Sequence, residues 1–420
     1  MNAVNLLYIY VGFRIFEQLF DTFLGTLNRR YYSRHENQIT AKKLLGISDE
    51  DFNKSLAYSS DKFIFGQVSG WINLSVTLAF LVLGGFAWVE TQAQLLSTMF
   101  NGNSIVTGLC FFGILGLLSM VVSLPFSYYS TFVIEQKHGF NRNTPARFFV
   151  DLIKGLVIGV LLGGAILALL LWIIENTGSY WWLYAWLAMT GFSLLTVWLY
   201  PTFLAPLFNK FSPLSDGDLK SQIESLAKKV GFETDGISVM NASLRSAHGN
   251  AYFTGVLGKK KIVLFDTLIE AMTPRQVTAV LAHELGHFKL HHVRGQLIRS
   301  TLMTGGMFYL LSILMPHEVV YSAFYLNGIS YYGAFLVFSM WFQVISFFTQ
   351  PLLTYVSRQN EFAADAFALQ YIEQKDELSN ALLKLREKSQ AMPISHPWYS
   401  AYHYSHPPML ERLAAMAEVN

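Results

Sequence analysis

The sequence predicts a helical integral membrane protein that carries a small α+β insert. Hydrophobic residues make up 52% of its 420 residues and charged residues only 14%, whereas soluble domains carry about 25% charged residues. Several stretches are long and apolar enough to cross a bilayer, and one polar segment, 206–299, interrupts them. The net charge of +2 gives no case for a nucleic-acid partner; the lipid bilayer is the expected partner.

Seven stretches approach the roughly 20 mainly apolar residues that a helix needs to cross the hydrocarbon core. The first is the weakest, because it contains Arg14, Glu17 and Asp21 at helical steps of three and four, which place them on one face. Those charges face a polar interior of the bundle, or else this half of the span lies in the interface; both interpretations stay open. The predicted spans are 4–26, 64–89, 104–134, 151–174, 181–205, 300–316 and 330–356.

The charges of the connecting segments predict the orientation. Segments rich in lysine and arginine (27–62, 135–150 and 206–299) alternate with segments that have none (90–103, 175–180 and 317–329). The positive-inside rule then places the N-terminus outside, and 206–299 and 357–420 on the cytoplasmic side. The first span is expected to stay as an anchor, because no cleavable signal peptide is apparent. The predicted division is a membrane domain 1–205, an insert 206–299, two further spans in 300–356 and a C-terminal helical segment 357–420.

The insert is predicted to contain both helix and strand. Apolar residues at helical spacing predict a helix over 216–231, and short alternating runs predict strands within 236–266, with a hairpin turn at Gly258-Lys259. Thr273-Pro274 predicts the start of a second helix, with the threonine hydroxyl as cap and proline in the first helical position.

That second helix contains His283-Glu284-Leu285-Gly286-His287. Two histidines four residues apart project from one face, so both rings can reach one Zn²⁺, while Glu284 lies beside the metal and can take a proton from the water it activates. A metzincin would need glycine at 290 and histidine at 293, where this chain has Leu290 and Val293. His291 and His292 are expected on the same helix, as surface or interface residues.

The third ligand is therefore sought on another helix. Glu361 and Asp365 are four residues apart and share a face, so Glu361 can bind the metal while Asp365 accepts a hydrogen bond from a ligating histidine. His406, before Pro407-Pro408, is either a group that stabilises the oxyanion of a hydrolytic intermediate or a turn histidine, and the residues alone do not decide.

These segments resemble the zinc-dependent type I CAAX prenyl endopeptidases, and the resemblance covers almost the whole chain. It rests on His283–His287, on Glu361–Asp365 and on Ser405–Pro408, together with the segments 134–141, 245–253 and 263–268. It implies a ring of seven long helices around a large water-filled chamber, one zinc ion per chain, and cleavage near the C-terminus of prenylated proteins.

The resemblance also implies a role for each matching residue. The ligands would be His283, His287 and Glu361, the catalytic base Glu284, and Asp365 would support a ligand or donate a proton. His406 and Arg412 would line the cleft. Asn250, Ala251 and Tyr252 would form the edge strand that binds an extended substrate, a role that unpaired strand groups suit physically.

The sequence thus predicts an integral-membrane zinc endopeptidase whose partners are the bilayer and a peptide or protein substrate, lipidated or not. A quality-control protease for membrane proteins would use the same site, and a transporter or channel-like protein with a structural metal is the alternative from another class. Short loops and the lack of an obvious endoplasmic reticulum retention signal favour a bacterial member in the inner membrane, with the endoplasmic reticulum as the eukaryotic alternative.

Overall fold

Helices make up most of the computed structural model, which describes residues 2–254 and 260–419. The helices are α1 (Ala3–Ser33), α2 (His35–Leu45), α3 (Asp49–Val82), α4 (Gly85–Ser97), α5 (Ser104–Tyr129), α6 (Pro145–Ile158), α7 (Gly164–Asn176), α8 (Trp181–Leu199), α9 (Ala205–Phe208), α10 (Asp218–Val230), α11 (Asp266–Ala271), α12 (Pro274–Lys289), α13 (His292–Leu314), α14 (Glu318–Ser322), α15 (Tyr331–Tyr371), α16 (Asp376–Ser389), α17 (Pro397–His403) and α18 (Met409–Val419). The strands are β1 (Phe211–Pro213), β2 (Ile237–Met240), β3 (Ala251–Thr254) and β4 (Lys261–Phe265).

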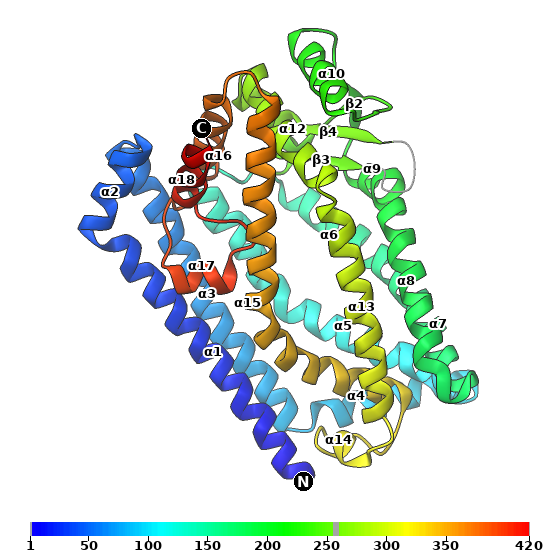
Figure 1. The fold of residues 1–420 in the computed structure, drawn as a ribbon. Coiled ribbons are helices and arrows are strands. Elements are labelled where there is room, and N and C mark those ends of the chain that lie inside the picture. The colour runs from blue at the N-terminus through cyan, green and yellow to red at the C-terminus, as the bar shows by residue number, and fades with distance from the viewer. Residues whose placement is uncertain (1, 255–259, 420) are drawn as a thin grey trace.

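Six helical segments of the described chain are long and apolar enough to cross a membrane. They carry six of the seven predicted spans. Three of them are lengthened by π-helical turns, Ser130–Glu135, Gly159–Gly163 and Tyr200–Leu204. The first predicted span falls on α1, whose 31 residues are not among the six. Helix α1 runs beside α3 from the N-terminus at one end of the molecule to α2 at the other (Figure 1), so its crossing stays a prediction.

The predicted boundary between a span and a loop at 89/90 is wrong. The span 64–89 is interrupted after α3, because Gly84 adopts a left-handed conformation with φ of 75° and α4 begins at the next residue. Helix α4 also occupies most of 90–103, which was expected to be a loop. Helix α15, which is continuous over 41 residues, crosses the division between 300–356 and 357–420, and the domain division stays a prediction.

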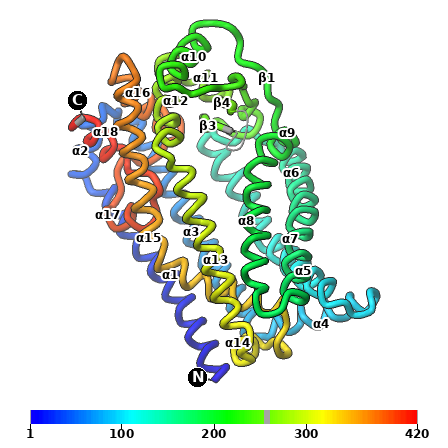
Figure 2. Tube along the Cα trace, turned by 45° about the vertical axis from the view of Figure 1, so that its right-hand side comes forward, coloured from blue at the N-terminus to red at the C-terminus, as the bar shows by residue number. Residues whose placement is uncertain are grey.

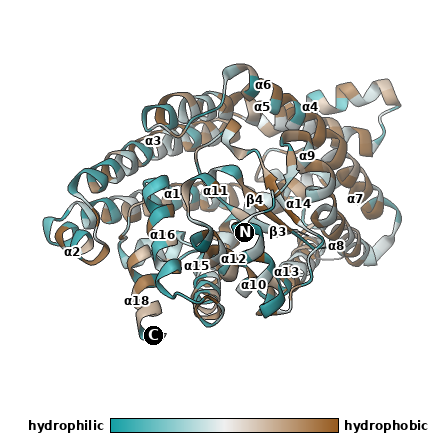
Figure 3. Cartoon of the chain, turned by 90° about the horizontal axis from the view of Figure 1, so that it is seen from above, coloured by the Kyte–Doolittle hydropathy of each residue, from teal (hydrophilic) through white to brown (hydrophobic). Residues whose placement is uncertain are grey.

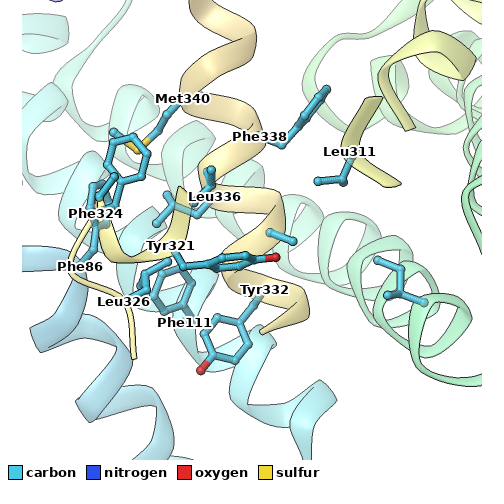
Figure 4. Close-up of a cluster of buried hydrophobic side chains, with 14 of the residues drawn as sticks. Phe86, Phe111, Leu311, Tyr321, Phe324, Leu326, Tyr332, Leu336, Phe338 and Met340 are labelled. Atoms are coloured by element: carbon cyan, nitrogen blue, oxygen red, sulfur yellow. The ribbon is translucent and has the colours of Figure 1, made fainter. Parts of the chain in front are cut away.

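The membrane part packs around a large cluster of apolar side chains. Figure 4 shows Phe111 of α5 and Tyr332 of α15 beside Tyr321, and Phe86 of α4 beside Phe324, while Leu311 of α13 lies to one side. Seen from above, α3, α5 to α8, α13 and α15 follow one another around the outline, with α12 and the strands nearer the middle (Figure 3). The expected arrangement of long helices around an interior is therefore present.

A buried carboxylate lies inside this cluster. Glu90 is 1% exposed; one oxygen accepts from the Tyr332 hydroxyl at 2.9 Å and the other from the backbone N–H of Asn327 at 2.9 Å. Because buried polar groups are costly without partners, these bonds tie α4 to the start of α15 and to the connection that precedes it.

The insert forms a four-stranded sheet in the order β1-β2-β4-β3. Strands β2 and β4 are parallel, whereas the outer pairs are antiparallel. The predicted strands and both predicted helices are confirmed; β1 was not predicted, and the proposed turn at Gly258-Lys259 lies outside the described residues. Apolar residues of α10 and of α12 share one core with the sheet, which holds α12 at the end of the molecule opposite the N-terminus (Figure 2).

Candidate metal centre

Helix α12 is fixed at its start and along its length. The Thr273 hydroxyl accepts from the Gln276 N–H and the Gln276 side chain accepts from the Thr273 N–H, a complete capping box. Behind the histidines, Val277, Leu281 and Leu285 are almost fully buried at helical spacing. This burial fixes the rotation of the helix, and with it the direction of its histidines.

Helix α15 approaches α12 closely at a glycine. A Cβ atom on Gly286 would lie 3.1 Å from both the Cα and the carbonyl oxygen of Ala364. The lack of a side chain on one helix and the small side chain on the other let the two backbones meet. Glu361, one turn before Ala364, is thereby brought next to His283 and His287.

The three predicted ligands form a compact triangle of donor atoms. The Nε2 atoms of His283 and His287 are 3.2 Å apart. Glu361 places its Oε2 3.5 Å from Nε2 of His283 and its Oε1 3.2 Å from Nε2 of His287. Two ligands of a tetrahedral zinc, each about 2.0–2.2 Å from the ion, are about 3.3 Å apart. The donor set therefore fits one metal ion.

The surroundings of Glu361 support the same conclusion. Its side chain is 5% exposed, and within the part of the chain that the structure describes its Oε2 is buried without a hydrogen-bond partner. A buried carboxylate oxygen without a donor is costly. A cation at the centre of the triangle would satisfy it, together with the two facing ring nitrogens.

Asp365 and Arg412 lie behind His283. Asp365 accepts at Oδ1 from the His283 ring, with Nδ1 2.8 Å away, and both its oxygens accept from Arg412, at 2.8 and 2.6 Å. Asp365 thus directs Nε2 of His283 toward the triangle, as predicted. Arg412 was expected to line the cleft and does border a cavity. The residue is only 8% exposed, and its guanidinium mainly holds Asp365 in place.

His287 has its own supporting residue, which the sequence reasoning missed. Helix α12 ends at Lys289, and His291, with φ of 60°, turns the chain into α13. The expectation that His291 and His292 continue the same helix is therefore wrong. The turn brings Nδ1 of His292 to 3.0 Å from Nδ1 of His287. No spacing rule marks such a contact, because it depends on the turn.

Glu284 lies between the two histidines in the sequence and is half-buried. Burial raises the pKa of its carboxyl above the ordinary value, while His283 and His287 act in the opposite direction. A carboxylate with a raised pKa, beside a metal site, is suited to accept and return a proton.

His406 faces the triangle from the open side. Its Nε2 is 3.4 Å from Oε1 of Glu361, and its side chain is 65% exposed. With Arg412, it borders a cavity of 940 Å³ that extends between α1, α3 and the C-terminal helices. The sequence left open whether His406 stabilises an oxyanion or only forms a turn, and this position favours a role in the cleft.

The predicted substrate strand is an edge strand. Strand β3 pairs only with β4 in the described sheet, and it contacts α12. Ala251 is buried, Tyr252 is half-buried and Asn250 is exposed. An edge strand in contact with the helix that carries both histidines has the arrangement that strand addition requires.

The segment before β3 is held by the membrane part. Nε2 of His248 lies 3.8 Å from Oε2 of Glu135, Asn141 bridges to Ser246, and Arg245 donates to both oxygens of Asp151 at 2.8 and 3.2 Å. Two segments that carry the family resemblance, 134–141 and 245–253, are therefore in contact.

Comparisons with known proteins agree with this geometry. Residues 28–210 match the model of the CAAX prenyl protease N-terminal domain, described with five membrane helices, and residues 213–420 match peptidase family M48. The chain belongs to peptidase family M48.

Relatives of this M48 peptidase match over nearly its whole length. The CAAX prenyl protease 1 homolog of Arabidopsis thaliana is 37% identical, over 99% of this chain and 98% of that protein. CAAX prenyl protease 1 of Saccharomyces cerevisiae is 37% identical, over 98% and 95%. The crystal structure of S. mikatae Ste24p matches with a TM-score of 0.92 and 36% identity, over 99% of this chain and 100% of that one.

The chain is therefore a multi-pass membrane metallopeptidase that acts on a peptide or protein substrate. These relatives come from plants and yeasts, so the expectation of a bacterial member has no support among them. The similarity to a crystal structure over the full length also confirms the helical membrane fold with its small α+β insert.

Proposed function

We propose that this peptidase is a zinc endopeptidase that cleaves near the C-terminus of prenylated, CAAX-type proteins. The observation that carries the zinc assignment is the triangle of His283, His287 and Glu361, whose edges of 3.2 to 3.5 Å match tetrahedral coordination. The names of its relatives support the substrate class.

The chain's own residues divide the work of hydrolysis. When bound, the zinc ion polarises the scissile carbonyl and acidifies a water molecule. Glu284 takes a proton from that water, whose oxygen bonds to the carbonyl carbon. As the C–N bond breaks, Glu284 returns the proton to the leaving amine. His406 donates to the oxyanion that develops on the carbonyl oxygen.

The remaining residues position these groups and the substrate. Asp365 holds the ring of His283 in the tautomer with a proton on Nδ1, which leaves Nε2 free for the metal. Arg412 holds Asp365. The edge at Asn250, Ala251 and Tyr252 binds the peptide in an extended conformation.

We also propose that the metal centre faces the cytoplasm and that the N-terminus is outside, as the alternation of basic loops predicts. The relatives favour an internal eukaryotic membrane such as the endoplasmic reticulum. Reactivity of single cysteines introduced at Asn2 and at Lys388 toward a membrane-impermeant reagent, in sealed vesicles, tests this. Labelling of both positions from the same side would contradict the orientation.

Glu284→Gln tests the mechanism. The substitution keeps the shape of the side chain but removes the base, so we expect one bound zinc per chain and a loss of turnover of about 10²- to 10⁴-fold. Glu270→Gln, at an exposed position of α11, is the matched control and should retain full activity. The rates at which the unaltered protein and both variants cleave one peptide are measured, with the peptide in prenylated and in unprenylated form. Undiminished cleavage by Glu284→Gln would refute the mechanism, and equal cleavage of the two peptides would refute the substrate class.

A further inference from the structure

Helix α16 carries a buried cation that has no counter-ion. Arg386 is 5% exposed, and within the described residues no carboxylate lies within ion-pairing distance of its guanidinium. In the part of the chain that the structure describes, its side chain makes one hydrogen bond, from Nη1 to the Ser55 hydroxyl at 3.4 Å, and its Nε is buried without a partner. Arginine cannot lose its proton in a protein, so this charge is buried with little compensation.

The nearest acidic residues are engaged elsewhere. Glu387 pairs with Lys384 at 2.9 Å, and Asp51 accepts from the Ser48 hydroxyl at 2.9 Å. Burial lowers the pKa of Arg386, and these two carboxylates only partly oppose the shift. The partial negative charge at the end of α16 favours a cation there, but it supplies no acceptor for Nε.

Whereas Arg386 lacks a hydrogen-bond acceptor, Gln390, one turn further on, lacks a donor. Its Oε1 is buried without a donor in the described structure, and its backbone adopts a left-handed conformation with φ of 48°. Non-glycine residues pay for that conformation, and such strain is concentrated at functional sites. A donor and an acceptor, both unsatisfied, therefore lie on the same end of α16.

Both residues line the 940 Å³ cavity, which His406 and Arg412 also border. Helix α16 reaches this position because Leu378, Ala381 and Leu382 pack in the core shared with α12. The unsatisfied groups and two neighbours of the metal ligands thus border one cavity.

We propose that Arg386 and Gln390 form a subsite for the C-terminal end of the peptide substrate. The terminal carboxylate accepts from the Arg386 guanidinium, and the N–H of the last residue donates to Oε1 of Gln390. A lipid phosphate would satisfy the arginine but carries no backbone N–H for the glutamine. The carboxylate of an acidic side chain is at least one carbon further from its backbone N–H than a terminal carboxylate is, so it fits the pair less well. This inference deepens the proposed endopeptidase function and rests on it.

The test compares three forms of one peptide with the full-length protein in vesicles of neutral lipid. The forms have a free C-terminal carboxylate, a C-terminal amide, or an amide with aspartate as the last residue. We expect kcat/KM for the free acid to exceed that for the amide by roughly 10- to 100-fold, the usual range for a hydrogen bond to a charged group. The aspartyl amide should behave like the amide.

Arg386→Met should abolish this discrimination by raising KM for the free acid, and a thermal unfolding midpoint close to that of the unaltered protein shows that the variant folds. Arg386→Lys keeps the charge without the planar fork and should discriminate by an intermediate factor. Lys388→Met, exposed on the same helix, is the matched control and should behave like the unaltered protein.

Three results would overturn the subsite: equal cleavage of acid and amide by the unaltered protein, full discrimination in Arg386→Met, or rescue of the amide by the aspartyl side chain. Binding of the same peptides to the Glu284→Gln variant, measured by fluorescence, keeps the two proposals separable. Preference for the free acid in binding, without cleavage by the unaltered protein, would remove the endopeptidase function and retain the subsite.

Discussion

The carboxylate of Asp365 should determine how tightly the metal is held. Its two oxygens face three donors: Nδ1–H of His283 at 2.8 Å, and Nε and Nη2 of Arg412 at 2.8 and 2.6 Å. Asp365→Asn keeps the shape but replaces one acceptor oxygen with an NH₂ group. Whichever way the amide turns, at least one donor then faces another donor in a site where the side chain is 3% exposed.

A buried donor without an acceptor costs about 1–3 kcal/mol. Loss of a residue that supports a metal-binding histidine typically lowers metal affinity by about 10- to 100-fold, which corresponds to about 1.4–2.8 kcal/mol. The two estimates agree, so we expect Asp365→Asn to weaken zinc binding by about 10- to 100-fold.

Competition with a fluorescent chelator measures this affinity without reference to turnover. Asp376→Asn, an exposed aspartate in the first turn of α16, is the control and should bind zinc like the unaltered protein. An affinity of Asp365→Asn within twofold of that value would refute the argument that this carboxylate fixes the orientation of His283.

Two further predictions concern the other side of the same site. His292→Ala removes the acceptor 3.0 Å from the His287 ring, but water can replace it at this half-buried position; zinc affinity in the same competition assay should fall by less than about tenfold. His291→Asn, which tolerates the left-handed backbone, should leave it unchanged, and a loss in His292→Ala as large as in Asp365→Asn would contradict the reasoning. Gly286→Ala would place a Cβ 3.1 Å from the backbone of Ala364, so thermal unfolding should show a loss of about 1–3 kcal/mol. Gly295→Ala, which meets only the flexible end of Arg299, should have little effect, and an unchanged melting temperature in Gly286→Ala would show that the helices do not need this close approach.

The membrane spans could be predicted because their signal is local. A chain in hydrocarbon must satisfy its backbone groups within each helix, so length and composition are enough to find most spans. The segment 90–103 was misjudged because Glu90 and its polar neighbours are typical of a loop. Its burial depends on Tyr332, which lies 242 residues away in the sequence, and no local pattern contains that contact.

In the candidate site, too, some residues follow from a local sequence pattern and others depend on contacts between distant segments. His283 and His287 follow from one helical spacing, and Glu361 and Asp365 from a second. The contact of His292 with His287 depends on the turn at His291, and the pairing of Arg412 with Asp365 depends on how α18 packs against α15. Supporting contacts of this kind join separate elements, so they become visible only when the chain is folded.

The connection between α12 and α13 relates the metal centre to the predicted span 300–316. His292, the first residue of α13, lies eight residues before the predicted start of that span, which at 1.5 Å per residue is about 12 Å along the helix. His292 also contacts the ligand His287 directly. An extended peptide advances about 3.3 Å per residue, so about four residues are enough to reach from the start of the span to the level of His292. A substrate whose lipid anchor stays in the bilayer can thus present a bond close to that anchor, whereas a site raised on a separate soluble domain would require a longer tether.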